Sequence, residues 1–174
     1  MRKISFIIAN SLDNFIARED DSVDWLKRSN EIKEFWTRLW TRFDTLLMGG
    51  GTYEFVEQEG MNWIAPKLTT YVFSRTLPTK GDEQVEIIDR DTIKFTRELK
   101  RQPGKDILLM GGGQLAQSFF NYQLIDEIGL IIQPVLLGSG VPLFPDVERQ
   151  INLELVESIS FANGCVYVLY QTNY

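Results

Sequence analysis

The hexapeptide Leu-Leu-Met-Gly-Gly-Gly occurs twice in this chain, at residues 46–51 and 108–113. Each copy joins an apolar run, which is typical of a buried strand, to a segment with helical character. Consecutive glycines allow positive φ and let another group come close to the backbone. The flanking residues of the two copies do not match, so they do not indicate a repeat protein. The pattern predicts two strand–turn–helix corners in one sheet.

The second corner, residues 106–120, is the stronger candidate for a binding site. The first turn of a helix offers free N–H groups and the positive end of the helix dipole, which together attract a phosphate. Two glycine-lined corners at one edge of a sheet would suit an elongated nucleotide. The alternative is a tight turn that binds nothing, because the segment has neither the dinucleotide-binding glycine spacing nor the lysine of a phosphate-binding loop.

Up to residue 122, strand-like runs alternate with helix-like segments, which predicts a largely parallel sheet. Helices are expected after Ser29 and Asp91, which are good N-cap residues. The C-terminal third is expected to be antiparallel, with a hairpin at Asn163-Gly164. The expected strands are 3–9, 45–48, 70–73, 85–88, 107–110, 128–133, 153–159 and 166–170; short helices are expected at 52–58 and after 113, and loops at 60–66 and 134–145.

Composition narrows the classes of function. The chain of 174 residues suits one α/β domain over 1–174. It has no histidine, which argues against a serine or cysteine triad and against a typical zinc site, so no metal is expected. The net charge of −6 argues against a nucleic-acid partner. Cys165 is the single cysteine and is expected to be buried, which suits a reducing cytoplasm. No apolar run is long enough to span a membrane.

In order and spacing, the motifs resemble those of the dihydrofolate reductase-like fold, and most closely the reductase domain of bacterial riboflavin biosynthesis. That resemblance implies a three-layer α/β/α domain with a mostly parallel mixed sheet and an antiparallel C-terminal hairpin. The motifs that carry it are IIANSLDNFIA at 7–17, WL at 25–26, FDTLLMGGGTYEF at 43–55, VFSRT at 72–76, ILLMGGGQLAQSF at 107–119 and LIDEIGLIIQPVLLGSGVPLF at 124–144.

The family binds NADPH along the sheet edge and transfers hydride to a heterocyclic substrate. The resemblance also implies a cis peptide bond between Gly111 and Gly112. By position it assigns the nicotinamide to Ala9, Ile16 and Ala17, the phosphates at the first corner to Gly50, Gly51 and Thr52, the adenosine with its 2′-phosphate to Phe73, Ser74 and Arg75, and the pyrophosphate to Gly111, Gly112, Gly113, Gln114, Leu115 and Ala116.

Two departures from the family's pattern bear on the chemistry. Gly50 and Gly51 stand where the first corner usually carries basic residues, which leaves Arg75 to bind a 2′-phosphate. Dihydrofolate reductases place an acidic residue where this chain has Asn30, which argues against dihydrofolate as substrate. A general acid, where the reaction needs one, would be Asp24 or Glu31.

We therefore expect an NAD(P)H-dependent reductase of a pyrimidine- or pterin-like compound, similar to 5-amino-6-(5-phosphoribosylamino)uracil reductase. One alternative is a nucleotide-binding homodimer with this fold and no turnover; another is an authentic dihydrofolate reductase. The resemblance also implies a homodimer, formed through segment 124–144. Its exposed apolar residues would pack either across a partner or over their own chain.

Overall fold

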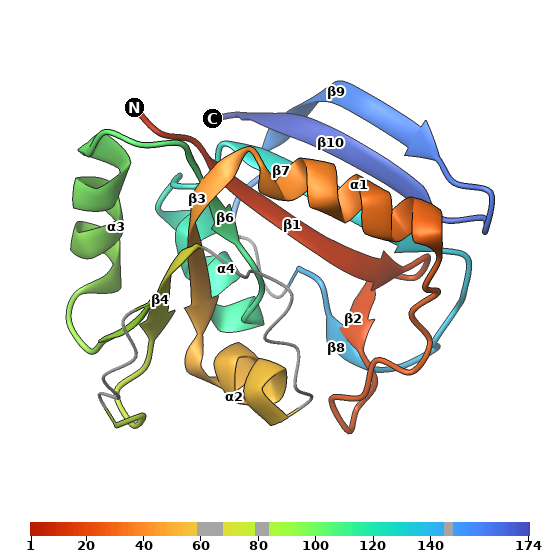
Figure 1. The fold of residues 1–174 in the computed structure, drawn as a ribbon, viewed down its shortest axis with the longest axis horizontal. Coiled ribbons are helices and arrows are strands. Elements are labelled where there is room, and N and C mark those ends of the chain that lie inside the picture. The colour runs from red at the N-terminus through yellow and green to blue at the C-terminus, as the bar shows by residue number, and fades with distance from the viewer. Residues whose placement is uncertain (59–67, 79–83, 145–147) are drawn as a thin grey trace.

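The structure is a computed structural model that describes residues 1–58, 68–78, 84–144 and 148–174 (Figure 1). The helices are α1 (Asn30–Trp40), α2 (Gly50–Gln58), α3 (Thr92–Arg101) and α4 (Gly113–Asn121). The strands are β1 (Ile4–Ser11), β2 (Phe15–Ala17), β3 (Phe43–Gly49), β4 (Thr69–Phe73), β5 (Val85–Ile88), β6 (Asp106–Leu109), β7 (Glu127–Gln133), β8 (Val141–Pro142), β9 (Asn152–Ser160) and β10 (Val166–Asn173).

Eight of these strands form one sheet in the order β5-β4-β3-β6-β1-β7-β10-β9. The strands from β5 to β7 are mutually parallel, whereas β10 runs antiparallel to both β7 and β9. The predicted α/β architecture with an antiparallel C-terminal hairpin is therefore confirmed. Because β1 lies between β6 and β7, the N-terminal strand is buried in the middle of the sheet.

Helices cover both faces of the sheet and make three layers (Figure 1). On one face α1 packs Phe35 against Tyr167 of β10, with 4.6 Å between the ring centroids. On the other face α4 packs Phe119 and Phe120 against β1 and β6, where Phe120 meets Phe6 edge to face. Apolar burial on both sides explains why the parallel strands read as nearly continuous hydrophobic runs.

The predicted caps and the predicted hairpin form as expected. The Ser29 side chain accepts a hydrogen bond from Ile32 N–H and starts α1, and Asp91 likewise caps α3. Gly164 has a φ of 88° in the turn between β9 and β10. Cys165 is buried, and its thiol donates to Gln133 Oε1 at 3.2 Å. Within the described residues, no helix has both the length and the apolar content that crossing a membrane requires.

The structure differs from the expectation in three places. The loop expected at 134–145 contains β8, which pairs with β2 in a separate two-stranded sheet. Helix α2 begins at Gly50, two residues before the expected start, so both glycines lie in its first turn. The peptide bond between Gly111 and Gly112 is trans, because positive φ at both glycines turns the chain without a cis bond. The loop expected at 60–66 lies outside the described residues.

The amino end of the sheet carries an ion network. The carboxylate of Glu127, whose side chain is 5% exposed, accepts hydrogen bonds from Lys3 Nζ at 2.8 Å, Ser5 Oγ at 2.8 Å and Arg42 Nη2 at 2.7 Å. Beside it, Arg2 pairs with Asp44. Burial raises the pKa of Glu127, but its three donors outweigh burial and hold that pKa below its ordinary value. This ion network stabilises the amino ends of the strands. The two glycine corners lie at the opposite, carboxyl ends.

Candidate active site

The two glycine corners meet at the carboxyl edge of the parallel strands. A Cβ placed on Gly112 would lie 3.4 Å from the backbone nitrogen of Gly49, so the corners are in direct backbone contact. A Cβ on Gly111 would lie 3.5 Å from Oγ1 of Thr52. The two corners are held in register by Met110 N–H, which donates to the carbonyl of Leu47 at 2.9 Å. The two copies of the motif therefore lie side by side and form one continuous stretch of backbone surface.

Helix α4 starts at this surface with its amide groups uncapped by any side chain. Its N-cap is Gly112, with φ of 87°, and no side chain accepts a hydrogen bond there. Of the first-turn residues, Gln114 is exposed, Gly113 and Leu115 are half-buried, and Ala116 is buried in the core. Uncapped N–H groups at the start of a helix attract anions.

The end of β4 lies against the start of α2. Ser74 Oγ accepts hydrogen bonds from Thr76 N–H at 3.2 Å and Leu77 N–H at 3.1 Å. A Cβ placed on Gly50 would lie 3.0 Å from the same oxygen, so only glycine fits there without displacing Ser74. Arg75, next along the chain, is exposed and has no ion-pair or hydrogen-bond partner among the described residues. Its guanidinium is available to an anion at this edge.

The residues expected to hold a nicotinamide lie at the end of β1 and on β2. Ala9 is half-buried and packs against the hydrophobic cluster under α1. Ile16 and Ala17 belong to β2, and Ala17 pairs with Val141 of β8. Gly140 approaches the carbonyl oxygen of Ala17 so closely that a Cβ there would stand 2.2 Å from it. One edge of β2 is therefore occupied by β8, which fixes the position of the short strand.

Several apolar side chains that pack on the core cluster under α1 are only half-buried. Trp36, Tyr53 and Met110 all pack against the same core cluster as Ala9 without being fully buried. Trp36 stacks on Trp40 with 5.4 Å between centroids and 27° between the rings. Sequence reasoning did not name Tyr53 or Met110 as site residues, although Met110 lies within the second glycine motif and Tyr53 stands two residues after the first.

The two candidate acids both make contacts at the protein surface. Asp24 pairs with Arg18 at 2.6 Å, and the hydrogen bond from Arg18 holds the pKa of Asp24 below its ordinary value. Glu31 Oε2 accepts a hydrogen bond from the backbone N–H of Ala162 at 2.9 Å. That bond joins the start of α1 to the β9–β10 hairpin. The glycine corners, by contrast, are brought together without involving either carboxylate.

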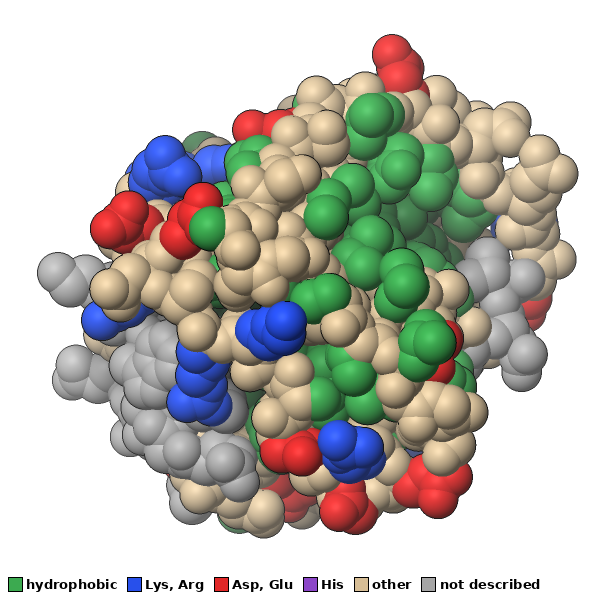
Figure 2. All heavy atoms as spheres, turned by 90° about the vertical axis from the view of Figure 1, so that its right-hand side faces the viewer, with side chains coloured by type: hydrophobic (Ala, Val, Ile, Leu, Met, Phe, Trp, Pro, Cys, Tyr) green, Lys and Arg blue, Asp and Glu red, His purple; other side chains and the backbone are tan. Residues whose placement is uncertain are grey.

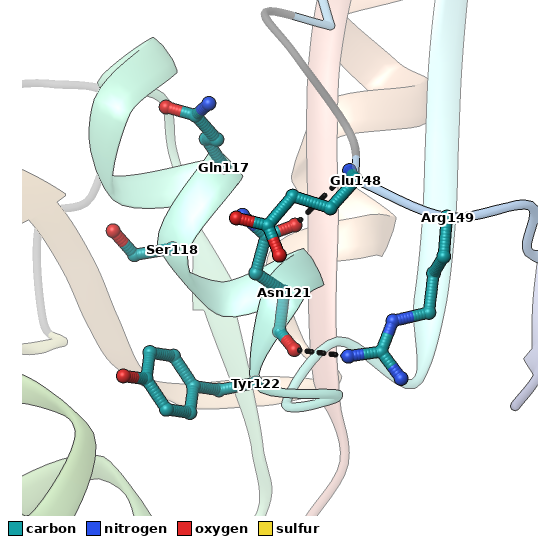
Figure 3. A pocket seen from close by; sticks show the side chains of 6 residues that line it. All are labelled: Gln117, Ser118, Asn121, Tyr122, Glu148 and Arg149. Carbon is teal, nitrogen blue, oxygen red and sulfur yellow. Dashed lines mark hydrogen bonds between the residues drawn. The ribbon is translucent and has the colours of Figure 1, made fainter.

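A hollow of a different kind lies at the far end of α4, away from the glycine corners (Figure 3). Arg149 Nη2 donates to the carbonyl of Asn121 at 3.1 Å across it. The residues that line it are Gln117, Ser118, Asn121, Tyr122, Glu148 and Arg149. None of them is a predicted site residue, and none is among the buried residues.

Comparison with known proteins agrees with this architecture. The family model of the RibD C-terminal domain matches residues 2–167. The uncharacterized protein YyaP of Bacillus subtilis is 35% identical over 184 residues, covering 99% of this chain and 96% of the relative. A Shewanella sp. PV-4 structure named for riboflavin biosynthesis superposes with a TM-score of 0.85 at 28% identity, covering 100% of both chains.

A more distant structure shows the same fold within a larger protein. It is a diaminohydroxyphosphoribosylaminopyrimidine deaminase/5-amino-6-(5-phosphoribosylamino)uracil reductase of Thermotoga maritima, with a TM-score of 0.74 and 16% identity. The match covers 99% of this chain but 57% of that protein. The two proteins therefore share a fold over the aligned part, which is little more than half of the Thermotoga maritima protein.

Proposed function

We propose that this chain, which belongs to the RibD C-terminal domain family, is an NAD(P)H-dependent reductase that prefers NADPH. The proposed substrate is a pyrimidine- or pterin-like heterocycle, and the proposed location is the cytoplasm. The observation that carries the proposal is the contact of the two glycine corners beside the uncapped start of α4. This arrangement suits the pyrophosphate of a dinucleotide.

The residues present fit such a cofactor. The positive φ of Gly111 and Gly112 turns the chain into α4, and no side chain caps the start of that helix, which suits binding of an anion. In this proposal, residues 111–116 hold the pyrophosphate, with Gly50, Gly51 and Thr52 on its other side. Phe73, Ser74 and Arg75 surround the adenosine and its 2′-phosphate, and Ala9, Ile16 and Ala17 orient the nicotinamide.

Bound reduced nicotinamide would supply the hydride, and the protein would supply alignment and exclusion of water. Tyr53 and Met110, which are half-buried and close in sequence to the two glycine corners, would contact the flat substrate. Asp24 and Glu31 are the two candidates for a general acid where the reaction needs one. The low pKa of Asp24 makes it a poor proton donor at neutral pH.

The proposal is tested first by cofactor binding. We expect NADPH to quench tryptophan fluorescence saturably, and Arg75→Ala to weaken NADPH binding by about ten- to a hundredfold without changing NADH binding, since one charge-assisted contact to the 2′-phosphate is lost. Arg101→Ala removes an exposed arginine at the opposite end of the sheet and serves as the matched control. Equal effects of Arg75→Ala on both cofactors would contradict the assigned 2′-phosphate contact, and no binding of either cofactor would contradict the reductase.

A second candidate function is nucleotide binding without turnover. It is favoured by the surface contacts of Asp24 and Glu31, which occupy both carboxylates elsewhere. Oxidation of NADPH in the presence of 5-amino-6-(5-phosphoribosylamino)uracil or a dihydropterin separates the two functions. Tight NADPH binding with no oxidation on any such heterocycle would favour the second.

A further inference from the structure

The side chain of Asp13 ties the turn between β1 and β2 to the loop that follows β7 (Figure 1). Its Oδ2 accepts hydrogen bonds from the backbone N–H groups of Leu137 at 3.0 Å and Gly138 at 2.8 Å. Its Oδ1 accepts a third from Ser11 Oγ at 2.6 Å. Because the two donors on the loop are backbone amides, a change of either side chain leaves them in place. One half-buried carboxylate thus joins two segments that are distant in the sequence.

The bond to Ser11 extends this tie to the first residue of β2. Ser11 is fully buried at the end of β1. Its Oγ donates to Asp13 and accepts a hydrogen bond from the backbone N–H of Phe15 at 2.9 Å. A hydroxyl that donates to one group and accepts from another is held in one orientation. The position of Asp13 therefore determines that of the amide at which β2 begins.

Apolar packing contributes little where the turn and the loop meet. Leu12 is 61% exposed and Leu136 is 68% exposed. Figure 2 views the molecule from this end and shows hydrophobic side chains lying open at the surface. Hydrogen bonds to an ionised acceptor are roughly twice as strong as those between neutral groups, so Asp13 contributes a large share of the tie.

Backbone hydrogen bonds flank the carboxylate on both sides. Leu12 N–H donates to the carbonyl of Val135 at 2.9 Å, and Leu143 N–H donates to the carbonyl of Asn14 at 2.9 Å. Segment 124–144 was expected to pack either across a partner or over its own chain. Leu143 is 1% exposed and packs into the core of its own chain, so this part of the segment is folded against the turn.

Strand β2 is too short to hold its own position. It has three residues and pairs with β8, which has two. A small two-stranded sheet is at best marginally stable by itself. Under the proposed function, Ile16 and Ala17 of β2 orient the nicotinamide. A small displacement of this strand would therefore misplace the reacting ring.

We propose that Asp13 is a positioning residue that holds β2 where it can orient the nicotinamide of the bound cofactor. The inference rests on the proposed reductase function and adds to it a residue that acts through β2. The hydrogen bond from Ser11 outweighs burial and, with those from Gly138 and Leu137, holds the pKa of Asp13 below its ordinary value. The carboxylate is therefore ionised at neutral pH and accepts on both oxygens, as its three donors require.

The test compares NADPH with 2′-phospho-ADP-ribose, which carries the same adenosine and phosphate groups but lacks the nicotinamide. Isothermal titration calorimetry measures both affinities. The wild-type chain should bind NADPH more tightly than 2′-phospho-ADP-ribose. Asp13→Ala should weaken NADPH binding by about tenfold and 2′-phospho-ADP-ribose binding by less than about twofold, because only the nicotinamide depends on β2. A general loss of structure would weaken both ligands together.

Two further variants separate positioning from lost stability. Asp13→Asn keeps an oxygen for the two loop amides while its NH2 group donates to Ser11 Oγ, so it should recover most of the NADPH affinity. Asp91→Ala is the matched control, because Asp91 also accepts hydrogen bonds from two backbone N–H groups, at the start of α3. It should lower the melting temperature measured by circular dichroism and leave the ratio of the two affinities unchanged.

Hydrogen exchange supplies a readout that needs no ligand. The backbone amides of residues 15–17 should exchange faster in Asp13→Ala than in the wild-type chain and in Asp91→Ala, since β2 has lost its tie. Unchanged exchange at these residues would overturn the proposal. So would an Asp13→Ala variant that weakens both ligands equally or weakens neither.

Failure of the proposed function is read from the wild-type chain alone. A wild-type chain that binds neither ligand contradicts the reductase, and the role of Asp13 falls with it. A wild-type chain that binds NADPH and 2′-phospho-ADP-ribose equally well contradicts the placing of the nicotinamide on β2. A wild-type chain that prefers NADPH, with the same preference in Asp13→Ala, contradicts the role of Asp13 and leaves the reductase proposal standing.

Discussion

Gly49 and Gly112 touch through their backbones, and this contact joins the two glycine corners. Gly112 has a φ of 87°, and a Cβ on it would meet the nitrogen and Cα of Gly49 at 3.4 and 3.5 Å. We expect Gly112→Ala to lower the free energy of unfolding by about 1–2 kcal/mol because the added side chain strains a backbone with positive φ. It should also weaken NADPH binding at least tenfold. Thermal unfolding and the fluorescence titration measure the two effects.

Gly138 provides the control for that substitution. Its φ is 79°, but no atom lies within 4 Å of the place where a Cβ would stand. Gly138→Ala should therefore show the backbone cost alone and leave NADPH binding unchanged. If Gly138→Ala weakened NADPH binding as much as Gly112→Ala, the close approach of Gly49 and Gly112 would have no role in binding.

Glu31 is expected to position α1 rather than to donate a proton. Its carboxylate accepts a hydrogen bond from Ala162 N–H, and a glutamine oxygen accepts the same bond. Glu31→Ala should lower stability by about 1 kcal/mol, whereas Glu31→Gln should keep both stability and turnover. The measurements are thermal unfolding and NADPH oxidation across pH. Loss of turnover in Glu31→Gln with stability intact would assign it as the proton donor.

Glu127 makes the free energy of unfolding depend on pH in the acidic range. Its folded pKa lies below its ordinary value, so its contribution to stability is present above the unfolded pKa of about 4.3 and is lost as pH falls through the folded pKa. Glu127→Gln should cost about 2 kcal/mol at neutral pH, because hydrogen bonds to a charged group are replaced by weaker ones. Urea unfolding at several pH values measures this cost.

The same pH series tests whether the charge of the Glu127 carboxylate causes this difference in stability. The difference in stability between wild type and Glu127→Gln should shrink below pH of about 4 as the wild-type carboxylate takes up a proton. Glu154→Gln removes an exposed glutamate from β9 and should change stability by less than about 0.5 kcal/mol. A Glu127→Gln difference that stays constant down to the lowest pH would contradict the ionic explanation.

Local signals made most of this fold predictable. Ser29 and Asp91 mark helix starts and Asn163-Gly164 marks a hairpin through chemistry confined to a few residues. The sequence did not predict the β2–β8 pair, because β8 has only two residues and one of them is Pro142. These two residues form a strand only by pairing with β2, which is distant in the sequence. The trans bond at Gly111 could not be derived either, since glycine permits several backbone paths through one corner.

Part of the candidate site was also predictable from the sequence. The repeated glycine motif indicated two corners, and the parallel connection of strands placed them at one edge. The packing of Tyr53 and Met110 on the core cluster under α1 depends on tertiary structure, which no local pattern records. The bond of Glu31 to Ala162 joins residues of two distant segments, so it appears only once the hairpin is folded over α1.

The central place of β1 has a consequence for biosynthesis. Ile4 pairs with Ile107 and Ser5 pairs with Glu127, so β1 is synthesised well before either of the strands that flank it. Pairings of such long sequence separation raise contact order and slow folding. During translation, β1 is an apolar segment with two open edges. A nascent chain that stops before β7 therefore presents a surface for aggregation or for a chaperone, and the final third of the chain closes it.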